Sequence, residues 1–156
     1  MKIYFISICG KASGNLAVLL KQQGHEVLGS EYSEKTFYPP IADMIRENKI
    51  PVDFSFDPEK ITRDIDLVIL GGAALIHDPN NPQIAKAKEL GLKIITTAKG
   101  IGEFISKEEH ISVVGNHAKT TTTSMIAWAL KECGEDISYF IGEAPLEFSN
   151  SIHSGE

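Results

Sequence analysis

The sequence predicts an α/β fold in which a parallel sheet carries helices on both of its faces. Segments rich in apolar, β-prone residues alternate along the chain with segments whose apolar residues recur at helical spacing. The strand segments are apolar on both faces, as strands are when helices cover a parallel sheet on both sides. A chain of 156 residues is long enough for one such domain and part of a second.

Six strands are predicted, at residues 3–8, 25–30, 52–56, 66–70, 93–97 and 110–115. Five helices are predicted, at residues 14–23, 40–48, 82–90, 98–105 and 119–133. Each strand is a short run of mainly apolar residues, and each helix has apolar residues on one face. Gly24, Gly91 and Gly134 follow three of the helices, where glycine accepts the left-handed conformation that ends a helix.

A charged stretch at residues 106–109 separates a predicted helix from a predicted strand, and we expect a domain boundary there. Residues 1–106 suffice for a compact domain. Residues 110–156 hold one predicted strand, one predicted helix and a tail, which bury little apolar surface by themselves. We therefore expect them to be the incomplete start of a second domain. The alternative is that they pack onto the first domain.

Composition and charge exclude several classes of protein. Hydrophobic residues make up 42% and charged residues 23% of the chain, which is a globular composition. The net charge of −6 argues against a broad nucleic-acid or anionic-membrane surface. No apolar run reaches the roughly 18 residues of a membrane span. Two cysteines, Cys9 and Cys133, are too few for a disulfide framework and lack metal-ligand spacing, which favours a cytoplasmic setting.

A glycine-containing turn joins the first predicted strand to the first predicted helix. Its candidate binding residues are Cys9, Gly10, Lys11, Ser13 and Gly14. Such a turn lets backbone N–H groups and the helix N-terminus hold a phosphate or diphosphate, as in Rossmann-like folds. The motif departs from G-x-G-x-x-G, because Ser7 and Cys9 occupy glycine-like places. The alternative is a plain strand-to-helix turn.

Two further candidates lie where predicted strands end. Ser30 and Glu31 end the second strand, where an acidic residue meets a ribose hydroxyl in dinucleotide-binding folds. A solvated loop carboxylate is the alternative. Gly72 and Ala73 end the fourth strand, on the edge where ligands bind in such sheets, and His77 follows in the same loop. A lone loop histidine is more often only solvated.

The most informative motif opens the last predicted helix. It comprises Gly115, Asn116, His117, Ala118, Lys119, Thr120 and Thr121. It is similar to the phosphate loop G-x-x-x-x-G-K-[ST], in which a lysine pairs with the phosphates of ATP and a hydroxyl coordinates Mg²⁺. Lys119 and Thr120 are the candidates for these roles. Ala118 places a Cβ where glycine serves a positive φ, which predicts weakened ATP binding. The alternative is a threonine-rich helix start.

Taken together, these motifs resemble the Mur ligase family of ATP-dependent amide ligases of peptidoglycan synthesis. The segment GNHAKTTTTSMIAWAL at residues 115–130 looks like that family's G-T-H-G-K-T-T-T-T-S-M loop and helix. The resemblance runs over the whole chain. The pattern I-C-G-x-x-x-G-x-L-A at residues 8–17, YPP at 38–40 and FIGEAPLEFSNS at 140–151 are more similar to the branch that recycles a peptide than to the branch that adds L-alanine.

The resemblance implies ATP and Mg²⁺ as cofactors and UDP-N-acetylmuramate as first substrate. Its muramyl carboxylate would take the γ-phosphate, and the acyl phosphate would then react with L-alanine or with L-Ala-γ-D-Glu-meso-diaminopimelate. The turn from Cys9 to Gly14 would face the diphosphate, Ser30 or Glu31 the ribose or uracil, and the loop of Gly72, Ala73 and His77 would close over the nucleotide. The family continues with domains that bind the amine, so this chain alone is expected to be inactive.

Two other hypotheses remain open. The short length and altered loops fit a stand-alone nucleotide-binding or sensing module without catalysis. The alternation of strands and helices, together with Glu31, fits a nicotinamide-dependent dehydrogenase domain. The broken G-x-G-x-x-G motif and the segment GNHAKTTTT argue against a dehydrogenase, which does not need such a loop.

Overall fold

The computed structural model describes residues 1–37, 39–72, 74, 78, 80–105, 109–143, 148, 151–153 and 155. The chain divides into two compact units, Met1–Gly100 and Ile101–Glu156. The division falls within helix α5 (Thr97–Phe104), a few residues before the boundary expected at 106–109. Of that expected boundary, only residue 109 is among the described residues.

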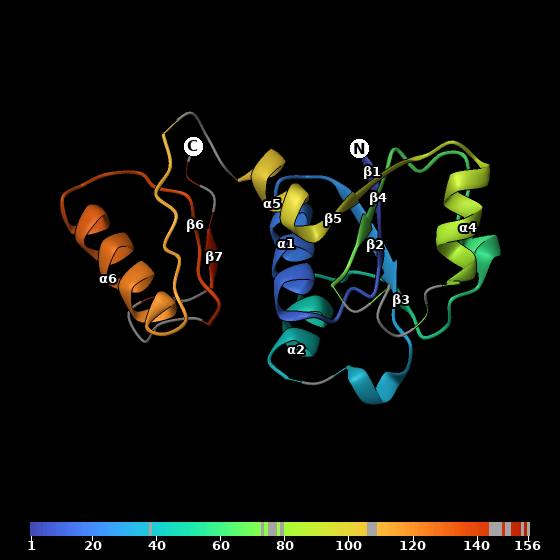
Figure 1. Ribbon diagram of the computed structural model, residues 1–156, viewed down its shortest axis with the longest axis horizontal. Helices are drawn as coiled ribbons and strands as arrows, with labels where there is room; N and C mark the ends of the chain where they lie inside the picture. Colours follow the sequence, from blue (N-terminus) through green and yellow to red (C-terminus); the bar gives the residue numbers. More distant parts are fainter. Residues whose placement is uncertain are drawn as a thin grey trace. The chain divides into compact units, whose positions relative to one another are not determined.

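A five-stranded parallel sheet forms the centre of the first unit (Figure 1). Its strands are β1 (Lys2–Ile6), β2 (Glu26–Ser30), β3 (Val52–Asp53), β4 (Leu67–Leu70) and β5 (Lys93–Thr96). Their order in the sheet is β3-β2-β1-β4-β5. Strand β1 is central, with Ile3 opposite Val27 on one side and Leu67 on the other. The strand order reverses between β1 and β4, which is where ligands bind in open α/β sheets.

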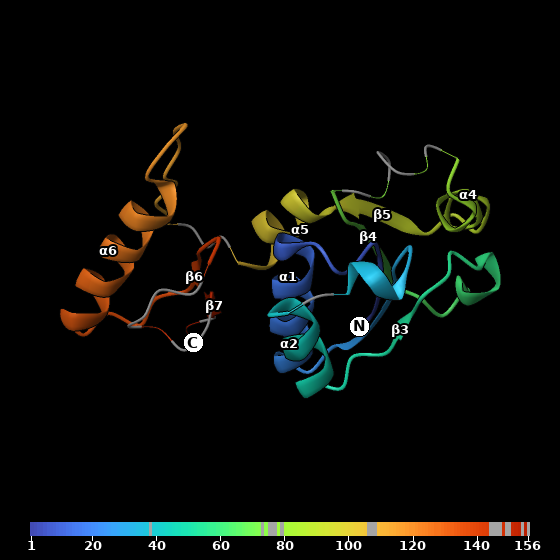
Figure 2. The same cartoon turned by 90° about the horizontal axis from the view of Figure 1, so that it is seen from below.

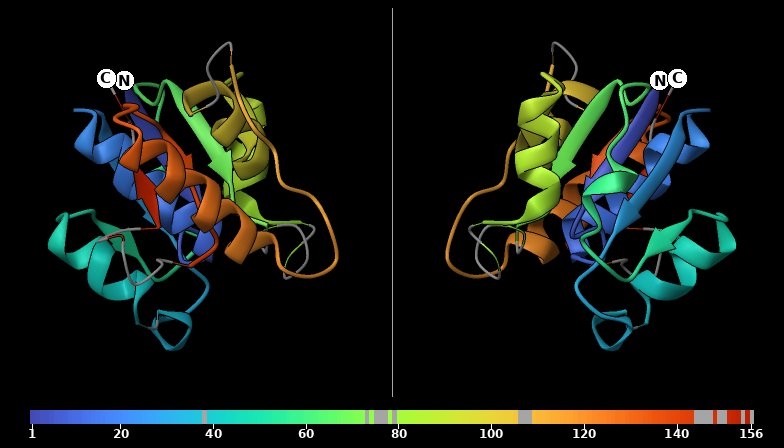
Figure 3. Two further views of the ribbon diagram at one scale, coloured as in Figure 1. Left: turned by 90° about the vertical axis from the view of Figure 1, so that its left-hand side faces the viewer. Right: turned by 90° about the vertical axis from the view of Figure 1, so that its right-hand side faces the viewer.

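Helices cover both faces of this sheet (Figure 2). Helices α1 (Lys11–Gln22), α2 (Ile41–Glu47) and α5 lie on one face, and α4 (Pro82–Glu89) lies on the other, beside β4 (Figure 3). Two short 3-10 turns, η1 (Glu34–Thr36) and η2 (Pro58–Lys60), lie in the connections. The predicted α/β class is therefore confirmed, with element boundaries that differ by a few residues.

Alternate residues of the strands fill two apolar layers. The layer under α4 contains Tyr4, Ile6, Ile61, Ile65, Val68, Leu70, Ala74, Ile84 and Ala87. On the opposite face, Gly100 of α5 lies against Leu16 of α1 and Ile69 of β4. Strand β4, with the sequence LVIL, is buried along its whole length. Burial on both faces explains why the strands read as continuous apolar runs.

The second unit contains helix α6 (Lys119–Glu132) and an antiparallel pair of short strands, β6 (Tyr139–Phe140) and β7 (Ile152–His153). Sequence analysis did not predict either strand. Its buried apolar cluster comprises Ala127, Ile141 and Phe148. Within the described part of the chain, no helix is both long and apolar enough to cross a membrane.

The strand predicted at residues 110–115 is wrong. Residues 110–114 carry no strand structure, and Ile111 and Val114 are 66% and 87% exposed. A strand forms only where a neighbour satisfies its backbone N–H and C=O groups. In the described part of the second unit, β6 and β7 pair with each other. The apolar run therefore has the composition of a strand but lies in a segment without strand pairing.

Candidate functional site

The loop after β1, residues 7–10, lies between the carboxyl ends of β2 and β4. The Ile8 N–H donates to the Ser30 carbonyl at 3.1 Å, and the Gly71 N–H donates to the Ile6 carbonyl at 2.8 Å. Ser7 has a left-handed backbone, with φ 62°. Its glycine-like place, noted in the sequence, is therefore a real conformational requirement. The loop lies at the carboxyl end of the sheet, where the strand order reverses between β1 and β4.

Helix α1 begins directly after this loop, with Gly10 as its N-cap. Gly10 offers no side-chain cap, and the first turn holds no acidic residue. Gly10 and Lys11 are both exposed. The N–H groups of a first helical turn carry the positive end of the helix dipole, and Lys11 adds a positive charge to that turn. This end of α1 is suited to an anion such as a phosphate.

Glu31 follows β2, and its side chain is turned inward toward this loop. The residue is 6% exposed. Its Oε2 accepts a hydrogen bond from the Cys9 N–H at 2.9 Å, and its Oε1 accepts one from the Tyr32 N–H at 2.8 Å. Burial raises the pKa of the Cys9 thiol well above its usual range, and the Glu31 carboxylate adds to that shift. Glu31 therefore joins the end of β2 to the loop after β1.

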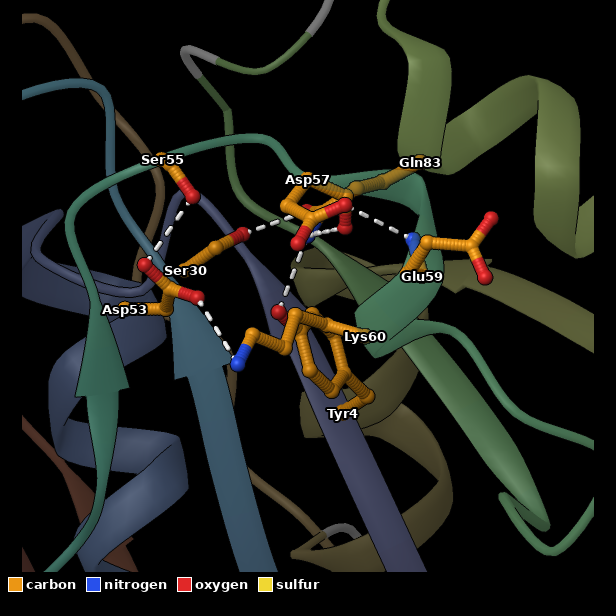
Figure 4. A network of polar contacts seen from close by, with 8 residues as sticks. All are labelled: Tyr4, Ser30, Asp53, Ser55, Asp57, Glu59, Lys60 and Gln83. Atoms are coloured by element: carbon orange, nitrogen blue, oxygen red, sulfur yellow. Dashed lines mark hydrogen bonds and ion pairs between the residues drawn. The ribbon is translucent and has the colours of Figure 1, made fainter.

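The Ser30 hydroxyl lies in a buried polar network (Figure 4). It donates to Gln83 Oε1 at 2.6 Å. Gln83 Nε2 donates in turn to Tyr4 Oη and to the Asp57 carbonyl, each at 3.0 Å. Ser30 and Gln83 are fully buried. The network joins β1 and β2 to α4 and η2, so the hydroxyl of Ser30 is engaged in the interior of the unit.

Ser13 and Gly14 fix α1 against its neighbours. Ser13 Oγ lies 3.0 Å from Thr97 Oγ1, which donates to the Leu70 carbonyl at 2.9 Å. A Cβ on Gly14 would collide with Ile41 of α2. Both residues are buried. Ser13 and Gly14 therefore have packing roles inside the first unit, whereas Gly10 and Lys11 are exposed at the start of α1.

The loop after β4 contributes Gly72 to the same edge. Gly72 is exposed, and the place that a Cβ would occupy is open. Ala73 and His77, predicted to close over the nucleotide, lie outside the described residues. So do residues 38, 144–147, 149 and 150 of the segments at 38–40 and 140–151.

A separate groove of about 600 Å³ lies on the α4 face of the sheet. Its lining is formed by Tyr4, Leu28, Gly29, Pro51, Val52, Asp53, Phe54 and Lys60. Lys60 Nζ lies 3.7 Å from Asp53 Oδ2 at this groove. None of the predicted site residues is among those that line it.

In the second unit, residues 115–118 form the turn that opens α6. Ala118 has φ 58° and ψ 9°, a left-handed conformation. The prediction that Ala118 occupies a place suited to glycine is confirmed by this backbone. Lys119 Nζ donates to the carbonyls of Gly115 at 2.6 Å and Asn116 at 3.3 Å. The ammonium therefore reaches back over the turn, in which His117 is exposed.

The hydroxyls of residues 120–124 differ in their partners. Thr123 Oγ1 donates to the Lys119 carbonyl at 2.8 Å, and Ser124 Oγ donates to the Thr120 carbonyl at 2.7 Å. Thr120 and Thr121 lie exposed in the first turn, directly after Lys119 in the sequence. A hydroxyl oxygen beside a lysine at a helix start fits a Mg²⁺–phosphate pair. No three His, Cys, Asp or Glu side chains gather into a metal site among the described residues.

Comparison with known proteins decides between the families considered. Residues 2–109 match the family described as "Mur ligase family, catalytic domain". This chain belongs to the Mur ligase family. The resemblance inferred from the sequence motifs is thereby confirmed.

Two curated relatives of this Mur ligase chain represent the two branches. It is 32% identical over 157 residues to the UDP-N-acetylmuramate–L-alanyl-γ-D-glutamyl-meso-2,6-diaminoheptandioate ligase of Escherichia coli, covering 100% of this chain and 33% of that protein. It is 33% identical over 141 residues to the UDP-N-acetylmuramate–L-alanine ligase of a Sulfurihydrogenibium species, covering 90% of this chain and 29% of that protein. The chain therefore spans about a third of the length of these relatives.

Solved structures agree with this assignment. A murein peptide ligase from Psychrobacter arcticus matches with a TM-score of 0.87 and 29% identity, over 100% of this chain and 34% of that chain. A UDP-N-acetylmuramate-alanine ligase from Thermotoga maritima matches with a TM-score of 0.81 and 27% identity, over 99% and 35% of the two chains. The Rossmann-like architecture predicted for the first unit is that of the Mur ligases.

Sequence reasoning placed Gly71 at the end of the fourth strand but did not identify Thr97 and Gln83, which also shape this end of the sheet in the Mur ligase chain. Thr97 bridges α1 and β4, and Gln83 fixes Ser30. Gly71 permits the close approach of the loop after β1. A glycine at the end of a buried strand was a visible signal for Gly71. Thr97 and Gln83 gave none, because their partners lie far away in the sequence.

Proposed function

We propose that this chain supplies the first-substrate domain and the phosphate loop of an ATP-dependent amide ligase that acts on UDP-N-acetylmuramate. The observation that carries the proposal is the turn at residues 115–118, where the Lys119 ammonium lies over the start of α6 in a chain of the Mur ligase family. The chain spans about a third of its relatives, so the complete reaction is proposed for a protein that includes further domains.

The two units bind different substrates in this proposal. Residues 1–106 bind the UDP end of UDP-N-acetylmuramate at the loop after β1, where Gly10 and Lys11 are exposed at the start of α1. Residues 110–156 begin the ATP-binding domain. The exposed N-terminus of α1, which is suited to an anion, supports the assignment of the UDP end to residues 1–106. The left-handed Ala118 followed by Lys119 supports the assignment of ATP to residues 110–156.

The proposed reaction has two steps. The muramyl carboxylate oxygen attacks the γ-phosphorus of ATP, ADP leaves, and an acyl phosphate forms. The amine of L-alanine or of an L-alanyl peptide then attacks the acyl carbon, phosphate leaves, and the nitrogen loses a proton to give the amide. Lys119 would neutralise charge on the transferring phosphoryl group, and Thr120 Oγ1 would hold Mg²⁺. Mg²⁺ supplies further charge neutralisation when bound.

The ATP half of the proposal is tested by titrating the chain with ATP and Mg²⁺ in a calorimeter. We expect saturable binding, and we expect Lys119→Ala to weaken it by at least about tenfold, because the phosphates lose their ammonium partner. Lys131→Ala, in the last turn of the same helix, is the matched control and keeps the wild-type affinity. Equal affinities of the two variants would contradict the assignment of Lys119.

The UDP-sugar half is tested with UDP-N-acetylmuramate and, in parallel, NADH. We expect the UDP-sugar to bind and NADH not to bind. Lys11→Ala should weaken it several-fold, whereas Lys21→Ala at the other end of α1 should not. Binding of NADH without the UDP-sugar would instead favour a dehydrogenase domain. A folded chain that binds neither ligand would refute the substrate assignment for residues 1–106.

A further inference from the structure

We propose that Glu31 is a positioning residue: it holds the loop after β1 in the geometry that receives the nucleotide diphosphate, and it does not itself contact the ribose. This inference rests on the proposed binding of a UDP-sugar. It differs from the usual role of an acidic residue at the end of the second strand, which is to accept a ribose hydroxyl.

Both carboxylate oxygens of Glu31 already have partners within the protein. Oε2 accepts from the Cys9 N–H at 2.9 Å and Oε1 accepts from the Tyr32 N–H at 2.8 Å. The oxygens keep further lone pairs, but the residue is only 6% exposed, so a ribose hydroxyl has little access to them. The geometry is that of an internal clamp.

The clamp acts on Cys9, the residue directly before the N-cap of α1. Cys9 precedes Gly10, the N-cap, so fixing the Cys9 N–H also fixes the direction in which the first N–H groups of the helix point. Gly10 contributes no side-chain cap of its own. The loop is anchored on its other side by the Ile8 N–H, which donates to the Ser30 carbonyl. Two consecutive N–H groups are thus tied to the end of β2.

Charge makes this clamp strong. A buried carboxylate is stable only when it is well hydrogen-bonded or paired with a cation. Glu31 has no ion pair among the described residues, so its stabilising contacts are these two backbone N–H groups and a hydrogen bond with the Cys9 thiol. Hydrogen bonds to an ionised acceptor are about twice as strong as neutral ones. Displacing the carboxylate from Cys9 would leave it buried and poorly paired, which favours the fixed loop.

The test compares UDP with uridine, which has the same base and ribose but no phosphate. Glu31→Gln replaces one oxygen by an amide NH₂ that cannot accept from an N–H, and Glu31→Asp keeps the charge but is one methylene too short. We expect both variants to bind UDP roughly tenfold more weakly, as expected for the loss of one charge-assisted hydrogen bond, and to bind uridine as wild type does. Glu34→Gln, an exposed carboxylate in η1, is the matched control and should change neither affinity.

Each other outcome has a distinct meaning. Equal losses for UDP and uridine would mean that Glu31 contacts the ribose, and tighter binding of UDP would mean that the carboxylate competes with the diphosphate; either overturns the positioning role. Unchanged UDP affinity in both variants overturns it as well, while leaving the proposed function intact. A wild-type chain that binds no UDP refutes both.

A measurement on the wild-type chain covers the case in which the variants do not fold. The amide protons of Cys9 and Tyr32 should be protected from hydrogen exchange without ligand, because both are bonded to the buried carboxylate. Exchange of the Cys9 amide at the rate of an open loop would overturn the clamp directly.

Discussion

Gly71, at the end of β4, lies so close to Ser7 that a Cβ at residue 71 would collide with the Ser7 carbonyl oxygen. The Gly71 N–H also donates to the Ile6 carbonyl at 2.8 Å. Ser7 is itself left-handed, with φ 62°. The backbone of the loop after β1 is therefore pressed against the end of β4 at the point where the sheet reverses its strand order.

Gly71→Ala should disrupt this contact. Because the colliding atom is a backbone oxygen and cannot rotate away, we expect the free energy of unfolding to fall by about 3 kcal/mol. Gly72→Ala is the control, since the place of its Cβ is open, and it should change stability by less than about 0.5 kcal/mol. Urea unfolding followed by far-UV circular dichroism measures both. Similar losses in the two variants would show that the contact with Ser7 is not the cause.

The turn at residues 115–118 carries backbone strain at Ala118. An alanine in the left-handed conformation costs roughly 1 kcal/mol, which glycine avoids. Ala118→Gly should therefore raise the stability of the second unit by about 0.5–1 kcal/mol, after the greater freedom of glycine in the unfolded chain is counted. We also expect tighter ATP binding, measured by titration.

Ala129→Gly is the opposite control for this substitution. Ala129 lies exposed within α6, where glycine lowers helix stability by about 1 kcal/mol. The two variants make the same chemical change and should shift the stability of the second unit in opposite directions. A loss of stability in Ala118→Gly would contradict the strain argument.

Residues 110–115 show which features of the fold could be predicted from the sequence and which could not. The strands of the first unit were predictable because their apolar runs are also buried there, as in LVIL of β4. The run at residues 110–115 has a similar composition, but the described part of the chain supplies no neighbour to pair with it. Composition determines whether a segment suits a strand, and pairing determines whether it becomes one.

The side chains at the edge of the sheet obey the same limit. The positions of Ser30 and Glu31 at the end of β2 followed from the sequence. The direction of each side chain did not, because it depends on Gln83 and on the Cys9 N–H, which lie 53 and 22 residues away. The conformational demand at Ala118 was predictable, since it arises from the backbone of the turn itself.

Cys9 predicts a dependence of stability on alkaline pH. The thiol of an unfolded chain ionises near pH 8.5, at about the ordinary cysteine pKa, whereas burial raises the pKa of Cys9 in the folded protein. Above roughly pH 8.5 the unfolded state therefore releases a proton that the folded state keeps. The contribution of the Cys9 thiol to stability should be fully present below that pH. Above it, the free energy of unfolding should fall by about 1.4 kcal/mol for each further pH unit.

The measurement is chemical unfolding between pH 7 and about pH 9.5, below the range where the raised pKa values of Tyr4 and Lys2 add the same trend. Cys9→Ala should lower the free energy of unfolding by the same small amount at every pH, and it should remove the fall of that free energy with pH. Cys133→Ala should retain it, because Cys133 is exposed. A slope that survives in Cys9→Ala would assign the effect to another group.

Trp128 allows the two units to be followed separately, because it is the single tryptophan of the chain and lies in α6. The buried apolar cluster of the second unit is small, with Ala127, Ile141 and Phe148 at its centre. The first unit buries the whole of β4 and most of β1 and β2. Since burial of apolar surface dominates stability, we expect the fluorescence of Trp128 to change at a lower urea concentration than the far-UV circular dichroism of the chain.

Substitutions in each unit give this expectation its control. Phe148→Ala should move the Trp128 transition to lower urea and leave the main dichroism transition in place. Ile69→Val, in the buried strand β4, should do the reverse, with a cost of about 1 kcal/mol. Coincident transitions that shift together in both variants would mean that the chain unfolds as one cooperative body, because only a shared transition responds to substitutions in either unit.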